Sequence, residues 1–153
     1  MNFLETKIPP PIVTAIFGLL IWLCRDFGAA IDFGRPLRIA SLIGFVVIAL
    51  AIDISAFLEF RKFKTTINPL APQNASNIVQ SGVFSKTRNP MYLGMVLLLS
   101  GWAIWNTSLI GLFLVGGFAL YIHFFQIKPE ERALSAKFGQ EYLDYLQKVR
   151  RWI

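Results

Sequence analysis

Four long apolar stretches interrupt the polar positions of this 153-residue chain. They cover residues 8–24, 37–60, 91–105 and 108–127. The second and fourth have the roughly 20 apolar residues that a helix needs to cross a bilayer, and the first and third are short for that task. The pattern predicts an all-α integral membrane bundle with four transmembrane helices, forming one domain over residues 1–153.

The link between the third and fourth stretches is very short, because only the sequence Asn-Thr-Ser at 106–108 separates their apolar parts. A link of this length joins antiparallel neighbours, so the two stretches predict a helical hairpin. Gly94, Gly101 and Gly111 lie within them, and small residues of this kind allow the backbones of membrane helices to approach closely.

The basic residues indicate how the bundle is oriented. Of the 15 lysines and arginines, only Arg25, Arg35 and Arg38 fall in the loop between the first two stretches and at its border. The positive-inside rule then places both termini, the loop 61–90 and the tail 129–153 in the cytoplasm. The expected location is the inner membrane of a bacterium.

Composition agrees with a membrane protein, since 55% of the residues are hydrophobic and 16% are charged, against about 25% charged residues in soluble domains. The net charge of +6 reflects basic cytoplasmic loops, and without a basic helix carrying interleaved aromatics it does not indicate a nucleic-acid partner.

The single cysteine, Cys24, excludes an internal disulfide and a cysteine-based metal cluster. No metal site is expected, because the chain also has a single histidine.

The polar tail over residues 129–153 predicts one or two cytoplasmic helices. Pro129 and the two glutamates after it suit a first helical turn, and a break is expected near Gly139. Tyr142 and Tyr145 are part of an apolar face at helical spacing. Two interpretations stay open: this helix lies on the membrane surface, or it packs against the bundle.

The stretch "TRNPMYLG" at 87–94 stands where a polar loop meets the third apolar stretch. In the simplest interpretation Asn89 caps the helix, Pro90 begins it and Arg88 marks the cytoplasmic side. In the functional interpretation, free N–H groups of the first turn and the Arg88 guanidinium form a site for a carboxylate or phosphate. Tyr92 adds a ring and a hydroxyl to that site.

A second group of polar residues follows the hairpin. On a continuous helix His123, Gln126 and Glu130 share one face, and Glu131 is next to it. Both ends of the hairpin lie on the cytoplasmic side, so Arg88 and a glutamate could face each other across a pocket and hold a zwitterion. The alternative is that the glutamates complement a helix dipole and pair with basic residues.

Asp53 is an ionisable residue inside the second apolar stretch. Such a residue suggests a functional site by default, here one for substrate. It is also near the cytoplasmic end of the stretch, where its carboxylate could reach the interface instead.

Two motifs together resemble a known family. "SGVFSKTRNPMYLG" at 81–94 and "EERALSAKFGQEYLDYLQKVRRW" at 130–152, separated by the hairpin, are similar to the isoprenylcysteine carboxyl methyltransferase family. These integral-membrane enzymes use S-adenosylmethionine, and phospholipid N-methyltransferases resemble them. The resemblance covers about residues 76–152.

The resemblance implies a cofactor pocket at the cytoplasmic end of the last two stretches, closed by the loop and the tail. The residues expected to bind S-adenosylmethionine are Ser76, Asn77, Ile78, Val79, Phe84, Arg88, Asn89, Pro90, Met91, Tyr92 and Glu130. The chain departs from the family at three of its motif positions: Asn89 replaces a histidine, Phe84 a tyrosine and Gln126 a substrate-binding arginine.

The expected function is S-adenosylmethionine-dependent methylation of a lipophilic or small amphipathic acceptor that enters from the bilayer and reacts through a carboxyl, amine or thiol group. Gln126 and Asp53 are the candidate substrate-binding residues. A protonated amine would need a general base, and His123 and Glu131 are the candidates for that catalytic role. Two alternatives stay open, a membrane reductase using NADPH on a related scaffold and a lipid-binding membrane protein without enzymatic activity.

Overall fold

The computed structural model describes residues 5–31, 34–65 and 70–153. Within these residues all regular structure is helical, and the one pairing of extended backbone is an isolated antiparallel bridge between Ala30 and Ser108. The predicted all-α class is therefore confirmed.

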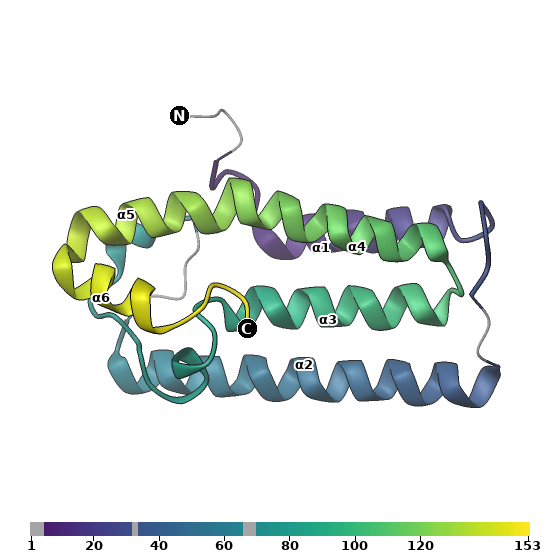
Figure 1. The fold of residues 1–153 in the computed structure, drawn as a ribbon, viewed down its shortest axis with the longest axis horizontal. Helices are drawn as coiled ribbons and strands as arrows, with labels where there is room; N and C mark the ends of the chain where they lie inside the picture. The colour runs from purple at the N-terminus through teal and green to yellow at the C-terminus, as the bar shows by residue number, and fades with distance from the viewer. Residues whose placement is uncertain (1–4, 32–33, 66–69) are drawn as a thin grey trace.

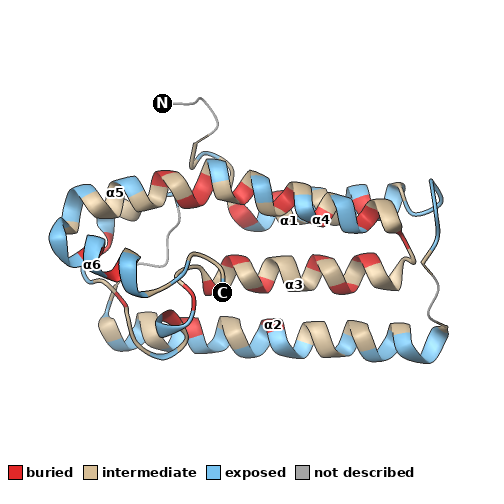
Figure 2. Ribbon diagram, in the orientation of Figure 1, coloured by how far each residue is buried: buried red, intermediate tan, exposed pale blue. Residues whose placement is uncertain are grey.

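Four helices form an elongated bundle: α1 (Pro10–Leu23), α2 (Arg35–Phe63), α3 (Pro90–Trp105) and α4 (Leu109–Ile122). α3 lies between α2 on one side and the neighbouring helices α1 and α4 on the other (Figure 1). Buried positions concentrate on α1, α3 and α4, and α2 contributes few of them (Figure 2). The core therefore sits between α1, α3 and α4, and α2 covers one side of α3.

Glycines on α3 allow α2 to approach it. A Cβ at Gly94 would stand 2.5 Å from an oxygen of Asp53, and one at Gly101 would stand 2.9 Å from Cβ of Phe45. Of the three glycines, only Gly111 allows close approach between the two helices of the predicted hairpin, because a Cβ there would stand 3.1 Å from Cβ of Ala103 in α3. The prediction of close approach is confirmed, but on α3 the partner of the glycines is α2 and not α4.

α4 does not end where the apolar stretch ends. It continues through a π-helical turn, His123–Ile127, into α5 (Lys128–Phe138). Pro129 has no N–H, so the carbonyl four residues before it, at Phe125, loses its helical donor. That carbonyl accepts a hydrogen bond from the backbone N–H of Thr6 instead, at 3.0 Å. The helix of the fourth apolar stretch is therefore continuous with the first helix of the tail.

The π turn also breaks the predicted common face of His123, Gln126 and Glu130, because it inserts an extra residue into one turn of the helix. Gln126 is completely buried and its amide donates to the carbonyl of Ile8 at 2.8 Å. Glu130 instead accepts a hydrogen bond from the Tyr92 hydroxyl.

α5 ends as the sequence predicts. Gly139 has a φ of 56°, a conformation that favours glycine, and α6 (Gln140–Lys148) folds back from it toward the start of α3 (Figure 1). The loop between α2 and α3 contains two short 3₁₀ turns, Pro72–Asn74 and Gly82–Ser85.

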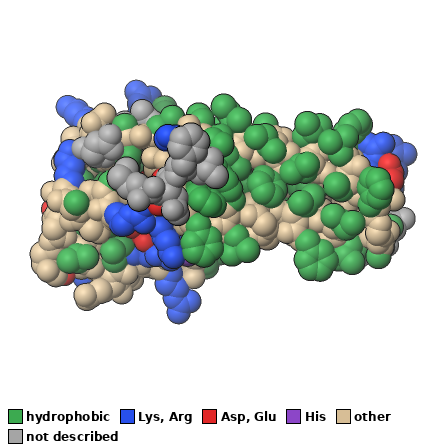
Figure 3. Space-filling view, turned by 90° about the horizontal axis from the view of Figure 1, so that it is seen from above, with side chains coloured by type: hydrophobic (Ala, Val, Ile, Leu, Met, Phe, Trp, Pro, Cys, Tyr) green, Lys and Arg blue, Asp and Glu red, His purple; other side chains and the backbone are tan. Residues whose placement is uncertain are grey.

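Two helices of the described residues are long and apolar enough to cross a membrane, α2 and the continuous helix Leu109–Phe138. α1 and α3 have 14 and 16 residues, which at about 1.5 Å per residue is shorter than a hydrocarbon core of about 30 Å. Hydrophobic side chains cover the middle of the elongated molecule, with lysines and arginines toward its ends (Figure 3). The four-span topology stays a prediction.

Candidate functional site

A cavity of about 450 Å³ lies where the loop, α5 and α6 meet the start of α3. This volume falls in the range of small-molecule sites, about 300–1,000 Å³. Its wall combines residues from the N-terminus of α1, from α2, from the loop and from the last two helices. The lining residues are Pro9, Pro10, Pro11, Phe60, Thr65, Leu70, Pro72, Ala75, Asn77, Ile78, Val79, Phe84, Arg88, Asn89, Pro90, Met91, Tyr92, Met95, Ile127, Glu130, Glu131, Leu134, Tyr142 and Tyr145.

All the expected cofactor-binding residues except Ser76 line this cavity. Ser76 points to the end of α2: its hydroxyl donates to the carbonyl of Lys64 at 2.9 Å, and its N–H donates to Thr65 Oγ1 at 3.0 Å. Next to it, the Asn77 amide donates to the carbonyl of Phe63 at 2.8 Å. These bonds satisfy the last carbonyls of α2 and fix the loop wall in place.

Glu130 is the one carboxylate in the cavity wall without an ion pair in the described part of the chain. Its partner is neutral, the hydroxyl of Tyr92, which is 6% exposed. A carboxylate in apolar surroundings needs a positive charge or further donors to offset the lost hydration. Glu130 therefore offers a site for a cation or for hydroxyl groups of a ligand.

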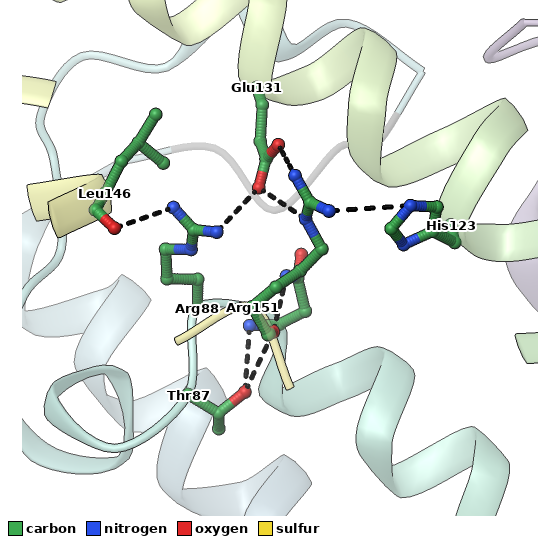
Figure 4. Close-up of polar contacts among 7 residues, drawn as sticks. Thr87, Arg88, His123, Glu131, Leu146 and Arg151 are labelled. Atoms are coloured by element: carbon green, nitrogen blue, oxygen red, sulfur yellow. Dashed lines mark hydrogen bonds and ion pairs between the residues drawn. The ribbon is translucent and has the colours of Figure 1, made fainter. Parts of the chain in front are cut away.

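Glu131 has the opposite environment, because two arginines hold it (Figure 4). Arg88 Nη2 lies 3.1 Å from Oε1, and Arg151 donates to both oxygens, from Nε at 3.0 Å and Nη2 at 2.6 Å. The Glu131 and Arg88 side chains are only 14% and 10% exposed. For Glu131 the simpler interpretation of the sequence, pairing with basic residues, is therefore confirmed.

The guanidinium of Arg88 is fixed by the protein. Its Nη1 donates to the carbonyl of Leu146 in α6 at 3.4 Å, and its backbone N–H donates to the carbonyl of Arg150 at 3.1 Å. Its Nε is buried and has no acceptor within the described residues. Arg88 therefore lines the cavity with its guanidinium held in place by the protein and with Nε free to donate.

Asn89 occupies the residue before α3, but its side chain does not cap the helix. The amide donates to the carbonyl of Arg151 at 2.8 Å, and the backbone N–H donates to the hydroxyl of Thr87 at 3.2 Å. The predicted cap is therefore wrong in this respect. No side chain of the described residues caps the first turn of α3, so N–H groups there stay available to a ligand.

α6 packs against the loop before α3 and against α5, and the interpretation that it lies on the membrane surface stays a prediction. The Tyr145 hydroxyl donates to the carbonyl of Phe84 at 2.7 Å, and both Tyr142 and Tyr145 are buried. Burial raises the pKa of both phenols, so they stay protonated at neutral pH and act as hydrogen-bond donors.

Three further predicted site residues, besides Ser76, are not part of the cavity lining. His123 Nε2 lies 3.4 Å from Arg151 Nη1, and Gln126 is buried against Ile8. Asp53 lies against Gly94 in the α2–α3 contact, with one carboxylate oxygen buried and without a partner among the described residues. Their proposed roles with the acceptor stay predictions that the cavity does not support.

The sequence reading missed several residues of the wall. Nothing in the sequence indicates that Pro9–Pro11, at the start of α1, reach the cavity. Phe60 read as the end of an apolar stretch. Tyr142 and Tyr145 carried a signal in their apolar spacing, but spacing alone does not name the surface that they contact.

The assembled cavity is mostly apolar, with a carboxylate, a fixed guanidinium and an uncapped helix start grouped on one side. Comparisons with known proteins give two matches. A family model described as phospholipid methyltransferase matches residues 37–141. A protein of Haemophilus influenzae, described only as an uncharacterized protein, is 46% identical over 63 residues, which are 41% of this chain and the whole of that protein. No solved structure matches the chain.

Proposed function

The chain belongs to the phospholipid methyltransferase family, and from this premise we propose that it is a membrane methyltransferase that binds S-adenosylmethionine in the cavity beside α3. The proposed acceptor is lipophilic or small and amphipathic. The observation that carries the proposal is Glu130, a carboxylate in an apolar wall whose partner is a neutral hydroxyl.

The polar groups of the wall fit the polar groups of this cofactor. Glu130 would hold the ammonium group or the ribose hydroxyls, because its carboxyl group has no cation of its own to pair with. The unused donor of Arg88 and the uncapped start of α3 would bind the carboxylate. The apolar side chains of Ile78, Val79 and Phe84 would cover the adenine.

The rest of the wall suits a lipophilic acceptor. Pro9–Pro11, Phe60, Met91, Met95 and Leu134 are apolar and come from four different elements. When bound, S-adenosylmethionine supplies an electrophilic methyl group that a nucleophile can attack in line. The side chains of this protein would position the two partners and exclude water, and positioning can contribute roughly 7–11 kcal/mol to such a step.

The surroundings of the candidate bases favour an acceptor that arrives deprotonated, such as a carboxylate or a thiolate. Both oxygens of Glu131 are engaged by arginines, and His123 lies outside the lining. A protonated amine would have to lose its proton to another group.

The direct test is isothermal titration of the purified protein in detergent with S-adenosylmethionine. We expect saturable binding, and Glu130→Gln should weaken it about tenfold or more, because a charge-assisted bond is lost. Arg25→Gln is the matched control, since Arg25 pairs with Asp26 at the far end of the molecule. No binding by folded wild-type protein would refute the proposal, and binding of NADPH in its place would favour the reductase.

A further inference from the structure

We infer that Arg151, two residues before Ile153, is a positioning residue that orients Arg88 toward the amino-acid half of S-adenosylmethionine. This inference rests on the proposed function. Arg151 is not part of the cavity lining, so it would act on a ligand only through other residues.

A continuous chain of contacts links Arg151 to the cavity (Figure 4). Arg151 donates to both carboxylate oxygens of Glu131, at 3.0 and 2.6 Å. Glu131 in turn holds Arg88 Nη2 at 3.1 Å. The planar guanidinium of Arg151 therefore fixes the orientation of the carboxylate, and the carboxylate fixes the guanidinium that faces the cavity.

Arg151 is itself held at both its backbone and its side chain. Its carbonyl accepts from the Asn89 amide at 2.8 Å, and its Nη1 lies 3.4 Å from Nε2 of His123. The preceding carbonyl, of Arg150, accepts from the N–H of Arg88 at 3.1 Å. The last residues of the chain thus run beside the start of α3, and His123 takes the role of an orienting neighbour outside the cavity.

This arrangement explains why one glutamate of the pair is neutralised and the other is not. Glu131 is occupied by two arginines and so serves as a fixed link, which leaves Glu130 as the carboxyl group available to a ligand. A lysine in place of Arg151 keeps the charge but cannot make the two parallel bonds that set the carboxylate plane.

The test compares two ligands in Arg151→Lys. S-Adenosylmethionine carries the amino-acid group, whereas methylthioadenosine has the same adenosine and sulfur without it. We expect Arg151→Lys to weaken S-adenosylmethionine about tenfold, and to change methylthioadenosine affinity by no more than about twofold. The matched control is Arg150→Gln, because the Arg150 side chain is exposed and only its carbonyl contacts Arg88.

Equal weakening of both ligands would show a merely structural role, and unchanged affinity for S-adenosylmethionine would also overturn the inference. Glu131→Gln provides a second variant if Arg151→Lys does not fold, and the same ligand-selective loss is expected of it. In the double variant the two losses should not add, because both changes break the same link. Failure of the wild type to bind S-adenosylmethionine would instead refute the proposed function.

Discussion

An arginine lies at each end of α3, and the two arginines make different contacts. At the C-terminal end, Arg38 of α2 donates from Nε to the carbonyl of Trp105 at 3.1 Å, and its guanidinium lies 5.3 Å from the centre of the Trp105 ring. At the N-terminal end, Arg88 faces the carboxylate of Glu131 and keeps one buried donor unused.

The surroundings of the two arginines differ in the same way. Near Arg38 the polar groups bind other groups of the protein. The Asn106 amide donates to the carbonyl of Trp102 at 2.8 Å, and Ser108 caps α4 by accepting from the N–H of Gly111 at 2.9 Å. Near Arg88 the first turn of α3 has no side-chain cap, and a cavity of about 450 Å³ opens. Polar groups in native interiors usually find partners, so the unmatched end is the one that points to a ligand.

The largest effect is expected from Arg88→Met. This change leaves Glu131 with one arginine and removes the guanidinium from the cavity wall, so stability should fall by about 3 kcal/mol and binding of S-adenosylmethionine should be lost. Chemical denaturation in detergent and isothermal titration measure the two effects. If Arg88→Met kept both stability and affinity, the contrast between the two ends would disappear.

Arg38→Met should lower stability alone. The variant keeps the apolar stem but loses the charge-assisted bonds to the Trp105 carbonyl, which at this partly buried position should cost about 1.5 kcal/mol. The affinity for S-adenosylmethionine should not change, because Arg38 lies at the other end of α3. A parallel fall in affinity would mean that the two ends are not independent.

Tyr92→Phe should weaken binding less than Arg88→Met does. The ring stays in place, but Glu130 loses the hydroxyl that orients it, and the loss of this donor at a buried carboxyl group should also lower stability by about 1 kcal/mol. We expect the binding free energy to weaken by about 1 kcal/mol, as for one hydrogen bond. A loss of stability without a change in affinity would indicate that the Tyr92–Glu130 contact is only structural.

Arg25→Gln should have the smallest effect on both quantities. Its ion pair with Asp26 is exposed, with side chains 40% and 82% accessible, and pairs of this kind contribute about 0–1 kcal/mol. The melting temperature and the affinity should both match the wild type, which sets the baseline for the other variants.

Much of the fold and the site could be predicted from the sequence, because hydrophobic runs, a very short link and Gly139 are local signals. The cavity wall from Asn77 to Tyr92 followed from the resemblance, and the structure brings those residues together with Glu130. The π turn was not predicted, and the carbonyl that Pro129 leaves free inside it accepts from Thr6, which is far away in the sequence.

The different environments of Glu130 and Glu131 could not be predicted from the sequence either. Two adjacent glutamates look alike in a sequence, and their difference arises from side chains that come from distant segments, Tyr92 for one and Arg88 with Arg151 for the other. The same is true of Asn89, whose side chain binds the last residues of the chain where a cap was expected. Local pattern locates such residues, and tertiary contacts decide their roles.

The most direct measurement is transfer of a radiolabelled methyl group from S-adenosylmethionine to a total lipid extract by the purified protein. We predict label in a lipid-soluble product with the wild type and with Arg38→Met, and a large loss of label with Glu130→Gln. Transfer that Glu130→Gln leaves unchanged, or no transfer by folded wild-type protein that binds the cofactor, would contradict the assignment of this cavity as a methyltransferase site.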